Sequence, residues 1–203
     1  MPASPIRVAL AGLSASPYAW ANTAHLPILL NHPSYRLTAI ISSSQSSGEA
    51  ALAAHSDSLP SNIKIYTSSA DAAADPDIDL VVVSVNVALH YEFTKPALEA
   101  GKNVFVEWPL GKDLAEAQEL NALRKENGAK GIVGLQERHS PTFNNIKDVV
   151  DSGRIGKVLS TTLSATMGGF GPGPLLDRYK YVVAEGSGAS VLSIPVMHSK
   201  SLL

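Results

Sequence analysis

The run that most constrains this chain is Asp79-Leu-Val-Val-Val-Ser-Val85, in which successive residues are apolar. A strand with one wet face alternates apolar and polar residues, whereas a strand that is apolar at each position is covered on both faces. Both faces are covered when a parallel sheet carries helices on either side. The run therefore predicts a parallel strand inside an α/β fold.

Strand-like and helix-like stretches alternate on both sides of this run. The other predicted strands are Ile6–Ala11, Arg36–Ile41, Ile63–Tyr66, Asn103–Glu107 and Gly131–Leu135. The predicted helices are Trp20–Leu30, Gly48–His55, His90–Ala100 and a segment capped by Asp113 that ends at Asn127-Gly128. Such alternation builds right-handed βαβ units. The predicted fold class is α/β, with a doubly wound parallel-sheet Rossmann domain over residues 1–136.

The pattern changes after Gln136. Pro141–Ser152 is predicted to be a helix, Lys157–Met167 a strand rich in Ser and Thr, and 168–174 a loop rich in glycine. We interpret residues 137–203 as the start of an incomplete α+β C-terminal domain.

Composition excludes several classes of function. The chain has 203 residues, is 45% hydrophobic, and carries a formal net charge of -2, which argues against direct nucleic-acid binding. It has no cysteine, and its six histidines show no metal-ligand spacing, so neither a disulfide framework nor a metal site is expected. No apolar run reaches the roughly 20 residues of a membrane helix. We expect a protein of the cytoplasm or the nucleus that binds no membrane.

The loop after the first strand reads "GLSASPYAW" and stands where a dinucleotide-binding protein has G-x-G-x-x-G. Gly12 supplies the first glycine, but Ser14 and Pro17 replace the other two. The candidate cofactor-binding residues here are Gly12, Leu13, Ser14 and Ser16. The loop itself leaves two interpretations open: a modified phosphate-binding loop, or a connection that binds nothing.

Two further strand ends carry polar candidates. Ser42 begins a serine run where an NAD site usually has a carboxylate for the ribose 2′-hydroxyl. This run either tolerates the 2′-phosphate of NADP or is a polar turn, and the absence of an arginine favours the turn. Ser84, Asn86 and His90 follow the central strand and are cofactor candidates, although Asn86 is equally suited to cap the next helix.

Longer stretches carry a resemblance to a known family. They are "DPDIDLVVVSVNVALHYEFTKPALEAGKNVFVEWPL", "GLQERHSP", "GRIGKVLSTTLSAT" and "GSGASVLSIPVMH". With these the chain resembles the glucose–fructose oxidoreductase, inositol dehydrogenase and rhizopine catabolism (Gfo/Idh/MocA) family. Within it, "WANTAH", "VEW" and "LQERHSP" are most similar to a fungal branch that includes a galactose-pathway repressor and oxidoreductase-like proteins. The resemblance implies NADP or NAD as cofactor, and a crevice that includes Glu107 and Trp108.

The departures from the family bear on catalysis. The resemblance implies Glu-Lys-Pro after the fifth strand, but here the triplet is Glu107-Trp108-Pro109. It also implies an Asp and a His spaced as D-x-x-x-H; His198 matches the histidine, and Ile194 stands at the aspartate position. His198 and Trp108 are thus the candidate catalytic residues. His198 lacks the aspartate that the family pattern pairs with it, and Trp108 lacks the charge of the lysine that the family pattern has at this position.

Three hypotheses follow from these residues. The chain is an NAD(P)-binding oxidoreductase-like protein with impaired or absent hydride transfer, a dinucleotide-binding regulator or scaffold, or an inactive truncated gene product. The expected partners are a dinucleotide and either another protein or a second copy of the chain.

Overall fold

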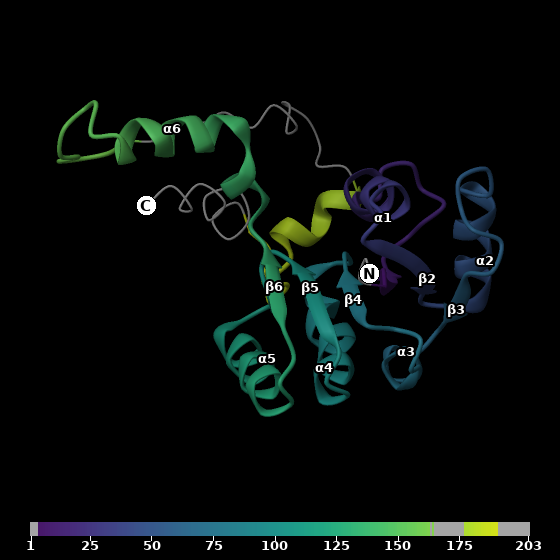
Figure 1. The fold of residues 1–203 in the computed structure, drawn as a ribbon. Coiled ribbons are helices and arrows are strands. Elements are labelled where there is room, and N and C mark those ends of the chain that lie inside the picture. The colour runs from purple at the N-terminus through teal and green to yellow at the C-terminus, as the bar shows by residue number, and fades with distance from the viewer. Residues whose placement is uncertain (1–3, 163, 165–176, 191–203) are drawn as a thin grey trace. The chain divides into compact units, whose positions relative to one another are not determined.

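The computed structural model describes residues 4–162, 164 and 177–190. The chain divides into two compact units, residues 1–134 and 135–203. The first unit is built on a six-stranded sheet in the order β3-β2-β1-β4-β5-β6 (Figure 1). Its strands are β1 (Ile6–Ala11), β2 (Tyr35–Ile41), β3 (Lys64–Tyr66), β4 (Leu80–Val83), β5 (Asn103–Glu107) and β6 (Gly131–Gly134). Every pairing is parallel, which confirms the predicted fold class.

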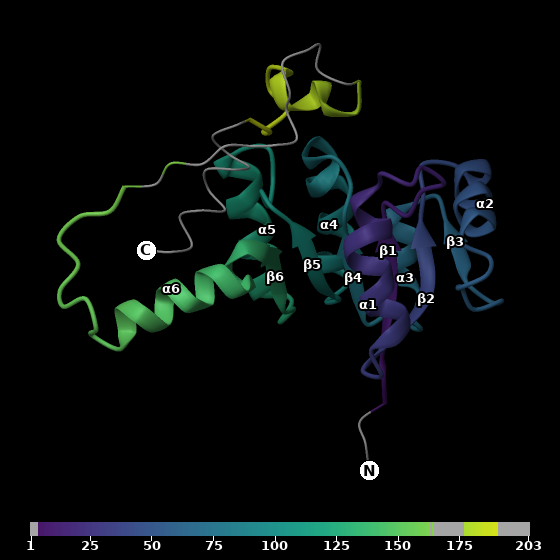
Figure 2. The same cartoon turned by 90° about the horizontal axis from the view of Figure 1, so that it is seen from above.

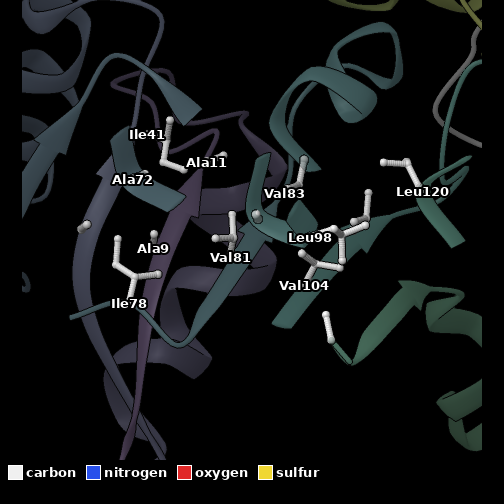
Figure 3. Close-up of a cluster of buried hydrophobic side chains, with 14 residues drawn as sticks. Ala9, Ala11, Ile41, Ala72, Ile78, Val81, Val83, Leu98, Val104 and Leu120 are labelled. Atoms are coloured by element: carbon white, nitrogen blue, oxygen red, sulfur yellow. The ribbon is translucent and has the colours of Figure 1, made fainter. Parts of the chain in front are cut away.

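Helices cover both faces of this sheet, as Figures 1 and 2 show. The helices of the first unit are α1 (Leu26–Asn31), α2 (Gln45–Ala54), α3 (Ser69–Ala74), α4 (His90–Glu99) and α5 (Leu114–Glu126). One buried cluster joins the sheet to α1 and α2. A second joins it to α3, α4 and α5, and part of that cluster is shown in Figure 3.

Successive strand residues belong to opposite faces. Val8 and Leu10 pack in the cluster with α1 and α2, whereas Ala9 and Ala11 pack in the other cluster. All of these residues are 0% exposed. Burying a valine- or leucine-sized side chain stabilises a fold by about 1.5–3 kcal/mol, so a strand apolar at each position favours the two-sided burial that the sequence predicted.

Side-chain caps fix where several helices begin. The Asp113 carboxylate accepts from the Glu116 N–H at 2.9 Å, which confirms the predicted start of α5. Ser44 and Ser47 form a reciprocal capping box at the start of α2. Ser68 caps α3, a six-residue helix that the sequence analysis missed because so short a segment shows no clear helical period.

The predicted helix over Trp20–Leu30 differs in detail. Residues Ala21–His25 form a π-helical segment, and regular α-helix begins only at Leu26. The Leu26 N–H donates to the Ala21 carbonyl, a spacing of five residues, and Pro27 has no N–H with which to continue an α-helical ladder back into this segment. Pro27 therefore helps to set the boundary between the two helical forms.

The second unit is described only in part. It contains short 3-10 helices at Gln136–His139 and Asp177–Val183, and α6 (Pro141–Asp151), which Ser140 caps. The strand prediction for Lys157–Met167 is wrong at the residues that are described, 157–162 and 164, which lie outside any strand. A strand needs a neighbour for its N–H and C=O groups, and the described residues of this unit provide none. The predicted 168–174 loop lies outside the described residues.

In the described ranges no helix is both long enough and apolar enough to cross a membrane.

Candidate functional site

The carboxyl ends of the parallel strands bring the predicted residues to one edge of the sheet. The order β3-β2-β1-β4 means that the chain changes direction across the sheet between β1 and β4, which makes their ends a topological switch point. Ligands of open α/β sheets bind in the crevice at such a point. Gly12 follows β1 there, and Ser84 follows β4.

Gly12 is required by the contact between these two strand ends. Its φ angle is +102°, and a Cβ built on it would lie 2.1 Å from the Ser84 carbonyl oxygen. Any L side chain at this position would displace the backbone, because that distance is far inside van der Waals contact. The structure therefore explains why the first position of the predicted motif is a glycine.

The Ser84 hydroxyl is the one unexplained polar group at the switch point. Its Oγ is buried and has no hydrogen-bond partner among the residues that the structure describes. Buried polar atoms are usually paired, so an unpaired one calls for an explanation, of which a bound water or ligand is one. The chemistry of this position fits a polar group such as those of a dinucleotide.

The loop after Gly12 is held by Asn22, a residue that sequence reasoning missed. The Ser14 N–H donates to Asn22 Oδ1 at 3.1 Å, and Asn22 Nδ2 donates to the carbonyls of Ser14 and Ser16 at 2.7 and 2.9 Å. The Ser16 N–H donates to Ser14 Oγ at 3.1 Å. These bonds occupy two backbone donors that a phosphate-binding loop would offer. Leu13 is 5% exposed and belongs to the core, so its side chain anchors the loop.

The carboxylate of Glu107, at the end of β5, connects to the segment that follows this loop. Its Oε1 accepts from Trp20 Nε1 at 3.2 Å and lies 2.5 Å from His25 Nε2. The side chains of His25 and Glu107 are 16% and 12% exposed. The His25 ring also meets Phe105 edge-on, with ring centroids 5.3 Å apart. Trp20 and His25 were not predicted as site residues, although they are the first and last residues of the stretch "WANTAH" that carried the resemblance.

Trp108 follows Glu107 and is half-buried, and the Trp108–Pro109 peptide bond is cis. An indole offers one N–H donor and cannot titrate, so it cannot replace the charge of a lysine.

His90 is buried rather than exposed at the strand ends. It is 1% exposed, with Nδ1 2.7 Å from the Pro109 carbonyl and Nε2 3.1 Å from the Val85 carbonyl. Burial lowers the pKa of His90, so the ring is favoured in its neutral form, which can donate to only one of the two oxygens. The residue connects the loops after β4 and β5, and its proposed contact with a cofactor stays a prediction.

The remaining candidates make local contacts. Asn86 Oδ1 accepts from the Ala88 N–H at 3.1 Å and caps a 3-10 helix at Val87–Leu89, which is the alternative considered from the sequence. Ser42 is 8% exposed, and its Oγ lies 3.3 Å from Ser47 Oγ in the serine cluster that caps α2. His198 and Ile194 lie outside the described residues. In the described part of the chain, no group of three or more His, Asp or Glu residues is arranged to hold a metal ion.

A doubly wound parallel sheet with a tight glycine turn after β1 defines a Rossmann-type fold. Residues 6–135 match the model of the oxidoreductase family with an NAD-binding Rossmann fold, and residues 141–203 match that of the Gal80p C-terminal domain. The chain belongs to the Gfo/Idh/MocA family, as its resemblance predicted. The family is NAD-binding, and a solved structural neighbour, a mutant of the 3-ketoreductase KijD10 from Actinomadura kijaniata, is in complex with NADP (TM-score 0.63, 28% identity, covering 76% of this chain and 44% of that one).

Two relatives point to different activities. The dehydrogenase aclE of Aspergillus oryzae is 41% identical over 164 residues, which are 79% of this chain and 44% of the relative. The galactose/lactose metabolism regulatory protein GAL80 of Saccharomyces cerevisiae is 30% identical over 208 residues, 99% of this chain and 47% of the relative. A crystal structure of a super-repressor mutant of that Gal80p superposes with a TM-score of 0.85 at 29% identity, covering 98% of this chain and 51% of that one. The chain thus spans about half the length of these relatives.

Proposed function

We propose that this protein binds NADP or NAD at the switch point between β1 and β4, and that its hydride-transfer activity is absent or very low. Gly12 shapes the turn, Ser84 Oγ offers an unpaired hydroxyl, and Ser14 and Ser16 offer hydroxyls to the phosphates. Asn22 already holds the Ser14 N–H, so we expect binding weaker than that of a regular glycine-rich loop.

The preference for NADP or NAD depends on the residues that follow β2. Residues 42–47 contain no carboxylate that would repel a 2′-phosphate or bind the ribose hydroxyl. We therefore propose that NADP is accepted as well as NAD. The bound cofactor would supply or accept a hydride at its nicotinamide, and the protein's part would be to position that ring.

The proposal of low activity rests on Trp108, which stands where the family resemblance implies a lysine. Proton transfer by a positioned group typically contributes about 10²–10⁴-fold to a rate, and an indole cannot titrate to provide it. We propose that Trp108 forms a wall of the crevice on the nicotinamide side. His198 has Ile194 in place of an aspartate partner, so we do not expect it to compensate.

A second candidate function is regulation through a protein partner, with dinucleotide binding retained. It is supported by the similarity to Gal80p, which extends over almost the whole chain and includes a match of residues 141–203 to the Gal80p C-terminal domain. The partner would be another protein or a second copy of the chain, in the cytoplasm or the nucleus. Under this function, residues 1–136 would be the nucleotide-binding part and 137–203 part of a second domain.

Calorimetry tests the proposed nucleotide binding, and an activity assay tests the proposed absence of hydride transfer. Heat saturating with NADP or NAD, together with no turnover of sugars or polyols, would support a dinucleotide-binding protein without hydride transfer. Turnover of any such alcohol would overturn the low-activity proposal, and would agree with the similarity to the dehydrogenase aclE. No heat with either nucleotide at millimolar concentration would overturn the binding proposal itself.

A further inference from the structure

The side chain of Asn22 orients one peptide group in the loop that follows β1. Asn22 is half-buried and lies in the π-helical segment after this loop. Its Oδ1 accepts from the Ser14 N–H at 3.1 Å, and its Nδ2 donates to the Ser14 carbonyl at 2.7 Å. Nδ2 also donates to the Ser16 carbonyl at 2.9 Å. One side chain thereby fixes both backbone groups of Ser14.

His55 supports this arrangement from another element. It follows α2, and its Nε2 lies 3.2 Å from the Ser14 carbonyl oxygen. In the tautomer that carries its proton on Nε2, the ring donates to that oxygen. The Ser14 carbonyl then has two donors, so a rotation of the peptide between Ser14 and Ala15 would break two hydrogen bonds.

The fixed carbonyl of Ser14 decides where the next N–H points. The C=O and N–H groups of a trans peptide point in opposite directions, so a Ser14 carbonyl that faces Asn22 turns the Ala15 N–H away from Asn22. Ala15 is exposed, and its N–H has no hydrogen-bond partner in the described part of the chain. The N–H groups of Ser14 and Ser16 are engaged, and Pro17 has none. The Ala15 N–H is therefore the backbone donor that this stretch leaves for a ligand.

A phosphate could not replace the Asn22 amide without a loss of hydrogen bonds. Phosphate oxygens are acceptors. In the place of Asn22 they could take the Ser14 N–H, but the carbonyls of Ser14 and Ser16 would lose the donor that Nδ2 provides and would face an anion. Such unpaired groups are unfavourable. Binding that leaves Asn22 in place keeps its three bonds, and the loop then offers the Ala15 N–H.

We propose that Asn22, supported by His55, is a positioning residue for the pyrophosphate of a bound dinucleotide. It holds the peptide between Ser14 and Ala15 so that the Ala15 N–H donates to a phosphate oxygen. Ser14 stands where the motif has the glycine that lets backbone approach the pyrophosphate, so a side chain that fixes this backbone takes on part of that role. The inference rests on the proposed nucleotide binding, and it assigns Asn22 no contact with the cofactor itself.

The test uses the full chain, with NADP as the probe and NMR of the backbone amides as the readout. NADP is expected to shift the Ala15 amide signal along a saturable curve. Asn22→Ala should weaken NADP binding about tenfold, the net effect of one or two hydrogen bonds. It should also make residues 14–16 more mobile on the picosecond-to-nanosecond timescale before NADP is added. Asn31→Ala is the matched control, because the Asn31 amide donates within α1 and should leave both readouts unchanged.

A second variant keeps the proposal testable if Asn22→Ala fails to fold. Ala15→Pro removes the N–H at an exposed position, and NADP affinity should fall about tenfold or more, because a hydrogen bond to a charged group is lost. The role of Asn22 is overturned, while the proposed function stands, if NADP shifts the Ser84 amide but not that of Ala15, or if either variant binds NADP as well as the unaltered chain. Unchanged order of residues 14–16 in Asn22→Ala would overturn it as well. If NADP shifts no signal in the unaltered chain, the proposed function and this inference fail together.

Discussion

His25 Nε2 lies 2.5 Å from Glu107 Oε1, although the two residues are 82 positions apart in the chain. The contact joins the π-helical segment after the loop that follows β1 to the end of β5, and Trp20 donates to the same oxygen. The position of the loop therefore depends on a carboxylate that belongs to another strand.

We predict that Glu107→Gln destabilises the first unit by about 1–3 kcal/mol, the usual effect of weakening a mostly buried hydrogen-bonded group. The amide keeps an oxygen for Trp20 or His25 but removes the charge that both donors face. Urea unfolding is the measurement, with Glu119→Gln as control, since Glu119 pairs with Lys95 at the surface and should matter less. Equal losses for the two variants would contradict the importance of the Glu107 contacts.

The second prediction compares two glycines with positive φ angles. Gly12→Ala should both destabilise the protein and abolish nucleotide binding, because the added Cβ meets the Ser84 carbonyl at 2.1 Å. Gly128→Ala meets nothing within 4 Å, so it should cost only the conformational strain of about 1–2 kcal/mol and leave nucleotide binding intact. Calorimetry with NADP and urea unfolding on both variants measure the difference, and a Gly12→Ala variant that binds normally would contradict it.

The strands and most helices of the first unit could be predicted because their signals are local. Asn103–Glu107 and Ile6–Ala11 have the bounds that the sequence predicted, since each is a short run with apolar residues that both faces can bury. Asp113 identified the start of α5 for the same reason, as a cap acts within one turn.

The side-chain contacts at the strand ends were less predictable, because they join residues that are distant in sequence. Nothing near Glu107 indicates that Trp20, 87 positions away, donates to it. Asn22 lies in the stretch "WANTAH" that carried the resemblance, but its bonds to Ser14 and Ser16 could not be predicted. They depend on the conformation of a loop that lacks two of the three motif glycines, so the motif does not predict that conformation. The strand predicted at Lys157–Met167 failed where it is described, because an alternating pattern does not supply the neighbouring strand.

The third prediction concerns Ser84→Ala. Removing a buried hydroxyl that has no partner in the described structure should leave the nucleotide-free protein equally stable or slightly more stable. The same change should weaken NADP binding about three- to tenfold if the hydroxyl pairs with the nucleotide. Thermal unfolding with and without NADP measures both effects, and unchanged binding would show that the hydroxyl serves a water instead.

The fourth prediction is a loss of stability in mild acid that depends on His90. Burial lowers its pKa in the folded state, whereas the unfolded chain takes up a proton near pH 6.5. The unfolded state therefore binds more protons below about pH 6.5, and stability falls as the pH drops through this range, by at most about 1.4 kcal/mol per pH unit. Urea unfolding at several pH values should show this slope, and His90→Asn should flatten it.

A separate acidic range tests whether the slope is assigned correctly. The hydrogen bond from Arg7 lowers the pKa of Asp79 to about 2, so this carboxylate contributes stability above about pH 4 that is lost toward pH 2. Asp79→Asn should lower stability above about pH 4 and remove the slope in that lower range, without changing the slope near pH 6. A slope near pH 6 that survives in His90→Asn would show that another group is responsible.

The last prediction addresses catalysis directly. Trp108→Lys restores the residue type that the family resemblance implies, yet we expect it to leave hydride transfer undetectable. A lysine beside Glu107 would add charge and a titratable donor, but Glu107 Oε1 is already shared by Trp20 and His25, and Ile194 still stands where an aspartate is implied. The assay follows NADPH formation with a panel of sugars and polyols, with nucleotide affinity measured in parallel to show that the variant still binds. Trp108→Phe is the matched control, since it keeps an aromatic ring without the N–H. Turnover that appears only in Trp108→Lys would show that a single substitution separates this chain from an active oxidoreductase.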